Sequence, residues 1–222
     1  MAIRSSSLVL VPVSISLIAP LPTPAAAQAD PVRCLVIDSL SQNPTLFDGL
    51  SAEARALLAT AGVRTEWRPA APDAAARDAE ALVIVLPEAP GAHPLCTLGA
   101  AVAEEGVARA GWVYAGPVAR LLGLDIRRKE TWSPHEARAF ARALGRVAAH
   151  ELVHVFLPEL PHSRSGLMRA SLRAQDLVGG APAVDGTTRV ALRHWLIAEL
   201  PASASSDRLS FNPVAAGRNP IP

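Results

Sequence analysis

The sequence predicts an α+β fold: a twisted, mostly parallel sheet of four or five strands with an antiparallel edge strand, packed against a backing helix and a long second helix. Apolar runs over residues 33–40 and 81–87 are rich in branched side chains and end at turn residues, which is typical of buried strands. Residues 133–157 combine a helix start signal with a long alanine-rich stretch. The chain has 222 residues, half of them apolar, which is enough for one such layered domain.

The backing helix is predicted over residues 51–62, with Ser51 as its N-cap and Gly62 as its end. The other predicted elements are a half-exposed strand at 63–68, a loop at 88–96, two short strands within 97–116, a short helix from 117, and helices near 169–178 and 188–199.

The long helix has the clearest local signals in the chain. Ser133 is placed as an N-cap, Pro134 occupies the first helical position and Glu136 follows three residues after the cap, which together form a capping box. Pro158 then predicts where the helix stops.

Residues 1–29 predict a signal peptide. Arg4 gives a short positive region, residues 8–18 form an apolar stretch too short to span a bilayer, and small residues are spaced for cleavage after Ala27 or Ala29. The alternative is an uncleaved membrane anchor, which the short apolar run disfavours. We therefore expect a secreted or periplasmic protein with no stable membrane insertion after cleavage.

Cleavage would leave a folded domain over residues 30–200 and a polar, proline-bearing tail over residues 201–222, which we expect to be disordered.

The predicted leader contains one of the 21 basic residues and none of the 20 acidic ones, so the mature chain is electrically balanced. This balance argues against a nucleic-acid partner. We expect a monomer.

The chain has two cysteines, Cys34 and Cys96. An even pair in an exported protein predicts a disulfide, and the alternative is two buried thiols. A contact between Cys34 and a metal, holding the protein latent, is a further alternative.

Residues His150, Glu151 and His154 form the pattern HExxH. On a helix, residues four apart share one face, so both imidazoles can bind one Zn²⁺ at about 2.1 Å. Glu151 can then act as a general base toward a zinc-bound water. Two histidines and a glutamate on an otherwise apolar helix would be costly to bury without such a purpose.

Two further residues extend this pattern, because His162 and Met168 follow in the stretch "PHSRSGLM". Over residues 147–170 the chain resembles the metzincin metallopeptidases, a group of zincins. In these proteins a third histidine follows the active-site helix and a methionine lies beneath the metal in the so-called Met-turn. The wider histidine spacing resembles that of bacterial secreted proteins.

The resemblance implies a secreted zinc-dependent endopeptidase with a zincin-like fold, acting on a peptide or protein substrate. It assigns His150, His154 and His162 as ligands of Zn²⁺, Glu151 as the catalytic base and Met168 to the Met-turn. Two other readings stay open: a non-catalytic exported zincin-fold protein that binds metal or peptide, and a structural domain with a fortuitous motif.

The departures from the metzincin pattern affect the third ligand. The usual glycine is replaced by Leu157, and His162 comes two residues later than in the family. Asp176, on the next predicted helix, and Glu159 are therefore alternative ligands.

A few neighbouring residues receive weaker assignments. The small-residue strand within "CTLGAAVA" is placed to border the cleft and pair with an extended substrate, or else is a plain edge strand. Tyr114 is expected to pack in the core. We do not expect His93, His135 or His194 to bind metal.

Overall fold

The computed structural model describes residues 31–38, 44–70, 81–89, 97–102 and 110–203. The predicted signal peptide, most of the predicted loop at 88–96 and the end of the chain after residue 203 lie outside these residues. Across the described part of the chain, no helix is both long and apolar enough to cross a membrane.

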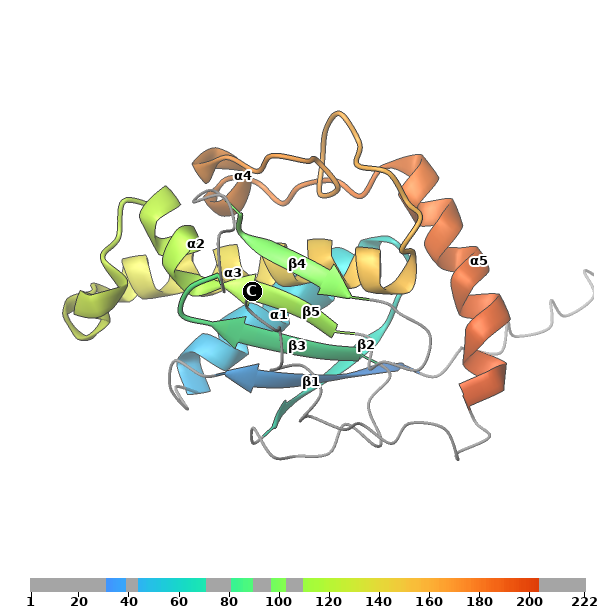
Figure 1. Cartoon of the computed structure of the whole chain (residues 1–222), viewed down its shortest axis with the longest axis horizontal. Coiled ribbons are helices and arrows are strands. Elements are labelled where there is room, and N and C mark those ends of the chain that lie inside the picture. Colours follow the sequence, from blue (N-terminus) through green and yellow to red (C-terminus); the bar gives the residue numbers. More distant parts are fainter. Residues whose placement is uncertain (1–30, 39–43, 71–80, 90–96, 103–109, 204–222) are drawn as a thin grey trace, which may run out of the picture.

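A five-stranded sheet forms the centre of the structure (Figure 1). Its strand order is β2-β1-β3-β5-β4. The strands are β1 (Val32–Asp38), β2 (Thr65–Ala70), β3 (Ala81–Leu86), β4 (Gly99–Val102) and β5 (Ala110–Tyr114). Four of them run parallel, and β4 pairs antiparallel with β5 at one edge. The predicted fold class and the predicted antiparallel edge strand are both confirmed.

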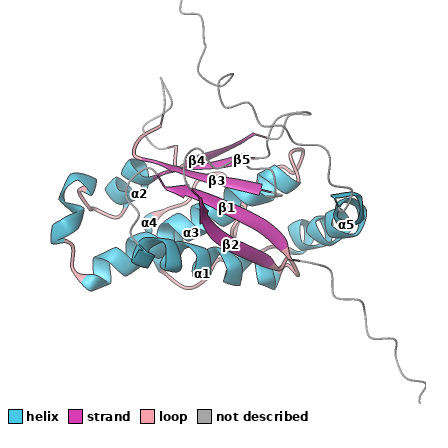
Figure 2. Ribbon diagram, turned by 90° about the horizontal axis from the view of Figure 1, so that it is seen from below, coloured by secondary structure: helices cyan, strands magenta, loops and turns pink. Residues whose placement is uncertain are grey.

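Two helices, α1 (Pro44–Thr60) and α3 (Pro134–Phe156), lie on one face of the sheet (Figure 2). They approach each other closely because small residues meet where they pack. An added Cβ on Gly49 would lie 2.7 Å from Ala141 Cβ, and one on Gly145 would lie 2.5 Å from the Leu50 carbonyl oxygen. This packing brings α3 into the core, where its buried residues join those of α1 and the sheet.

The predicted start of α1 is wrong. The helix begins seven residues before Ser51, at Pro44, a residue type favoured in the first helical position. Ser51 is only 4 % exposed inside the helix, and its hydroxyl donates a hydrogen bond to the Asp48 carbonyl at 3.2 Å. The predicted end is confirmed, since Gly62 follows the helix with a left-handed φ of 88°.

The long helix α3 has the capping box that its sequence predicts. The Ser133 hydroxyl accepts a hydrogen bond from the Glu136 N–H at 3.2 Å, and the Glu136 carboxylate accepts one from the Ser133 N–H at 2.7 Å. The helix ends at Phe156. These local bonds fix its first turn.

The remaining helices are α2 (Ala115–Leu121), a 3₁₀ helix (Ile126–Thr131), α4 (Ala174–Val178) and α5 (Gly186–Ser203). The helix predicted at 169–178 is shorter than expected, because residues 169–173 belong to an irregular segment. Helix α5 extends to Ser203, and the rest of the predicted tail over residues 201–222 lies outside the described residues, so its disorder remains a prediction. The 3₁₀ helix was not predicted.

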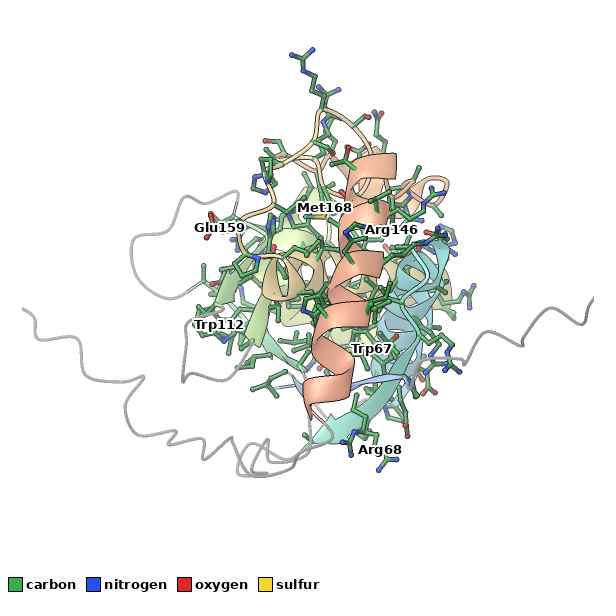
Figure 3. The ribbon with its side chains drawn as sticks, turned by 90° about the vertical axis from the view of Figure 1, so that its right-hand side faces the viewer. Trp67, Arg68, Trp112, Arg146, Glu159 and Met168 are labelled. Carbon is green, nitrogen blue, oxygen red and sulfur yellow. The ribbon has the colours of Figure 1, made fainter. Side chains whose placement is uncertain are left out.

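A buried arginine connects three of these helices. Arg146, on α3, is 2 % exposed, and its guanidinium donates to the Glu53 carboxylate of α1 at 2.7 Å. The same group donates to the carbonyls of Asp176, Gly179 and Gly180, which close α4. The guanidinium of Arg146, which is labelled in Figure 3, therefore anchors the end of α4 to the helix that carries the histidines.

Cys34 is buried in β1, where it pairs in register with Trp67 and Ala81. Cys96 lies outside the described residues, so the disulfide remains a prediction. The metal latch at Cys34 is not supported, because the one metal-binding cluster among the described residues consists of histidines alone.

Candidate metal centre

The last turns of α3 carry His150, Glu151 and His154. The two histidine rings lie one turn apart on one side of the helix in an edge-to-face arrangement, with their centroids 4.9 Å apart. The helix stops at Phe156, and Leu157 leaves the helical conformation with a φ of −133°. Pro158 has no N–H with which to continue the helix, so the chain turns back toward the histidines.

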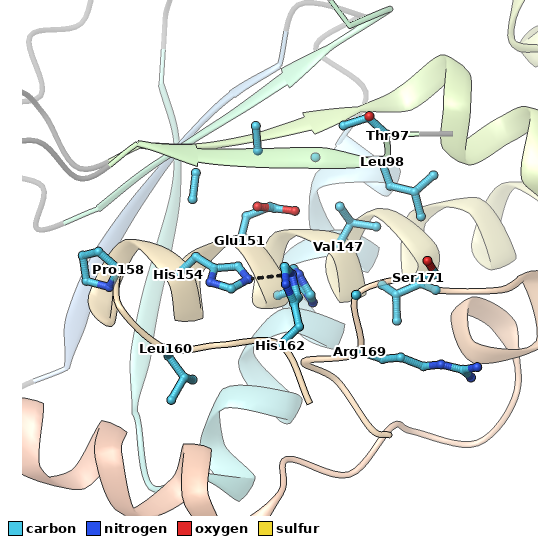
Figure 4. Close-up of a pocket in the computed structure, with 16 residues that line it drawn as sticks. Thr97, Leu98, Val147, Glu151, His154, Pro158, Leu160, His162, Arg169 and Ser171 are labelled. Atoms are coloured by element: carbon cyan, nitrogen blue, oxygen red, sulfur yellow. Dashed lines mark hydrogen bonds between the residues drawn. The ribbon is translucent and has the colours of Figure 1, made fainter. Parts of the chain in front are cut away.

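This turn brings His162 to the other two histidines (Figure 4). Its Nε2 lies 3.1 Å from Nε2 of His154, and its ring centroid is 5.3 Å from that of His150. One donor nitrogen from each of the three rings lies within 4.8 Å of the others. Tetrahedral zinc sites place neighbouring nitrogens about 3.4 Å apart. The three imidazoles therefore fit a single Zn²⁺ ion.

The orientation of His150 is fixed by the backbone. Its Nδ1 lies 2.8 Å from the carbonyl oxygen of Leu167, a geometry in which a protonated Nδ1 donates and leaves Nε2 for a metal. Leu167 is held in turn, since its N–H donates to the Ala183 carbonyl at 2.9 Å. An outer layer of this kind orients metal-binding histidines in many proteins.

Met168 follows directly and is fully buried. Its carbonyl accepts a hydrogen bond from the Ser163 N–H at 2.7 Å, which closes a small loop next to His162. Gly166 turns this loop with a left-handed φ of 77°. Met168 thus lies in the core beside the histidine loop, and its assignment to a Met-turn remains an interpretation of the sequence.

The two alternative third ligands lie outside the histidine cluster. The Asp176 carboxylate caps the start of α4, where it accepts a hydrogen bond from the Arg173 N–H at 2.9 Å and faces Arg169 at 3.5 Å. Glu159 is exposed on the outer surface (Figure 3). Neither residue belongs to the group that could hold a metal, whereas His162 does.

Burial sets the protonation of these side chains. Burial lowers the pKa of His154 to about 4, with further lowering from the charges of His150 and His162. The pKa of His150 is lowered by burial as well. Both rings are therefore neutral near pH 7 and can accept a metal. Glu151 is 7 % exposed, and burial raises its pKa to about 8.

The raised pKa of Glu151 gives an expected pH dependence for the metal-free protein. Between about pH 5 and 8 the folded protein keeps a proton on Glu151 that the unfolded chain releases, because the carboxyl pKa is near 4.5 there and about 8 in the fold. Metal-free wild type should therefore lose stability relative to Glu151→Gln as the pH rises through this window. Thermal unfolding of both proteins in chelator measures the difference, and a difference that is constant from pH 5 to 8 would contradict it.

The histidines lie in an open cleft of about 700 Å³. Strand β4 and the preceding Thr97 and Leu98 form one wall, and α3 forms the floor. The opposite wall includes Leu160 and Leu172, which the sequence did not indicate as site residues. The only feature of the sequence that could have indicated them is that they lie close in the chain to His162 and Met168.

The other singled-out residues do not join the cluster. Tyr114 is 1 % exposed at the end of β5, as expected for core packing, and burial together with the negative charge of Glu151 raises its pKa. His135 lies in the first turn of α3 and His194 on α5. His93 is outside the described residues.

No family model and no curated protein matches the chain. Among solved structures, archaemetzincin from Methanopyrus kandleri is 18 % identical, with a TM-score of 0.48, over 75 % of this chain and 96 % of its own. A zinc-dependent peptidase from Methanocorpusculum labreanum is 14 % identical, with a TM-score of 0.49, over 72 % of this chain and 99 % of its own. These likenesses are too weak to assign a function to this chain.

Proposed function

We propose that this protein is an exported zinc-dependent endopeptidase of the metzincin type. The observation that carries the proposal is the convergence of three histidine nitrogens within 4.8 Å of one another, with a buried glutamate beside them in an open cleft. Export to the periplasm or the medium rests on the predicted leader at residues 1–29 and remains a prediction from the sequence.

His150, His154 and His162 would hold the zinc ion, and the Leu167 carbonyl would keep His150 in the required orientation. When bound, zinc supplies an acidified water molecule and polarises a peptide carbonyl. Glu151 accepts the proton of the attacking water and passes it to the leaving amine. Its burial keeps competing solvent away from the carboxylate and raises its basicity.

The outer edge of β4, with which no described strand pairs, offers a binding surface for an extended peptide. The Tyr114 N–H donates to the Leu98 carbonyl at 2.8 Å, so Leu98 points its backbone toward β5. Backbone direction alternates along a strand. The register, which pairs Gly99 with Val113 and Ala101 with Gly111, therefore directs the N–H and C=O groups of Gly99 and Ala101 toward the free edge. A substrate strand can pair there, above the histidines.

The test of this proposal is metal content combined with peptide cleavage. Purified protein should contain about one zinc ion per chain. It should cleave members of a mixed peptide library within their sequence, lose this activity in chelator and recover it with added zinc. Zinc binding without any cleavage would favour the alternative, a non-catalytic metal- or peptide-binding protein. Absence of stoichiometric zinc would refute both.

A further inference from the structure

The side chain of Glu151 lies against two glycines of the sheet. A Cβ added to Gly99 of β4 would lie 2.5 Å from Oε1 of Glu151 and 2.8 Å from its Cδ. A Cβ added to Gly111 of β5 would lie 3.0 Å from the Glu151 Cβ. Both glycines therefore leave room for the side chain of Glu151. Gly99 lies at its carboxylate, and Gly111 lies at its Cβ.

Backbone conformation does not explain these glycines. The described glycines with left-handed φ values are Gly62, Gly123 and Gly166, and neither Gly99 nor Gly111 is among them. Glycine inside a strand is generally unfavourable, and it marks places where another group approaches closely. At Gly99 the approaching groups are the carboxylate of Glu151 and the Trp112 carbonyl oxygen, 2.7 Å from the added Cβ.

Gly99 also has a second contact surface. Its N–H and C=O groups point toward the free edge of the sheet, because Leu98 uses its own carbonyl to bind β5. One residue thus meets the Glu151 carboxylate through its Cα and presents its backbone to the place where a substrate strand would pair. Position 99 of β4 therefore lies between the Glu151 carboxylate and the edge of the sheet where a substrate strand would pair.

We propose that Gly99 is a positioning residue, which holds the carboxylate of Glu151 against β4 and so fixes its distance from a peptide bound at this edge. The proposal rests on the proposed peptidase function. Any side chain at position 99 would overlap the Glu151 carboxylate and displace it from this position. Gly111 supports the same arrangement by letting α3 approach the sheet at Glu151.

A double-mutant cycle in thermal unfolding tests the contact without any measurement of activity. We expect Gly99→Ala to lower the melting temperature of the metal-free protein by several degrees, and to lower it clearly less in the Glu151→Ala background. The clash with the Trp112 carbonyl is present in both backgrounds, so it cancels.

Gly116→Ala is the matched control, because its added Cβ would meet Glu88 and the Pro87 carbonyl rather than Glu151. This variant should cost the same stability in both backgrounds. If Gly99→Ala is also additive with Glu151→Ala, the proposed contact is refuted.

Activity separates positioning from packing. Zinc-loaded Gly99→Ala should keep its zinc and its KM but lose at least 10-fold in kcat, since misplacement by about 1 Å can cost on the order of 100-fold. Glu151→Asp, whose carboxylate is withdrawn from position 99, should reduce kcat less in Gly99→Ala than in wild type. Unchanged kcat in Gly99→Ala would overturn the proposal.

The two proposals fail in distinguishable ways. If wild type and all variants bind zinc but cleave no peptide, the peptidase function fails and the catalytic role of Gly99 fails with it, even where the unfolding cycle shows coupling. If wild type cleaves peptides and the double-mutant cycle shows no coupling between positions 99 and 151, only the role of Gly99 is refuted.

Discussion

Glu151→Gln is expected to reduce peptide hydrolysis by about 10²- to 10⁴-fold while leaving zinc content unchanged. Glutamine has nearly the same shape as glutamate, so it fits between α3 and β4, where Gly99 leaves room for it. Its amide cannot accept a proton from the attacking water. The fall should appear in kcat rather than in KM, because substrate pairing with β4 does not involve this side chain.

Glu159→Gln is the matched control for this experiment. Glu159 lies on the exposed segment between the second and third histidines, outside the histidine cluster. The same chemical change there should leave kcat and zinc content as in wild type. If Glu151→Gln hydrolyses peptides as fast as wild type, Glu151 is not the base and the proposed mechanism is wrong.

The parts of the fold that the sequence predicts correctly depend on local interactions. The capping box of α3 involves residues three positions apart, and the spacing of His150 and His154 follows from the helical repeat. Strand β3 consists of apolar residues alone and lies at the centre of the sheet, so its apolar run predicts a buried strand without reference to other segments. Each of these signals is readable without knowledge of distant residues.

The failed or missing predictions depend on distant residues. Glycine is unfavourable inside a helix, so Gly49 does not indicate a helix in the sequence. In the structure a larger residue at this position of α1 would clash with Ala141 of α3. For the same reason Gly99 and Gly111 could not be linked to Glu151, which follows 52 and 40 residues later. Leu160 and Leu172 reach the cleft only through the turn at Pro158 and the loop at Met168. Sequence periodicity carries no information on such contacts.

The third ligand was left open by the sequence, and single substitutions should resolve it. We expect His150→Ala and His154→Ala to lose stoichiometric zinc, and His162→Ala to bind zinc more weakly. Removing a residue that only hydrogen-bonds to a metal ligand typically lowers metal affinity by about 10- to 100-fold. Because His162 is expected to bind the metal directly, His162→Ala should lower zinc affinity by at least this factor. The reason is that the Nε2 atoms of His154 and His162 lie 3.1 Å apart, and that His162 belongs with His150 and His154 to the group that could hold a metal ion.

Asp176→Ala should behave differently from the histidine variants. It removes the acceptor at the start of α4, which should cost about 1 kcal/mol of stability, and it should retain zinc. His135→Ala is the control for removal of a histidine from α3 outside the cluster, and it should also retain zinc. Zinc per chain after dialysis against a competing chelator measures all of these variants. If Asp176→Ala lost the metal while His162→Ala kept it, the centre would be of the aspartate type, and α4 would have to move toward the histidines when zinc binds.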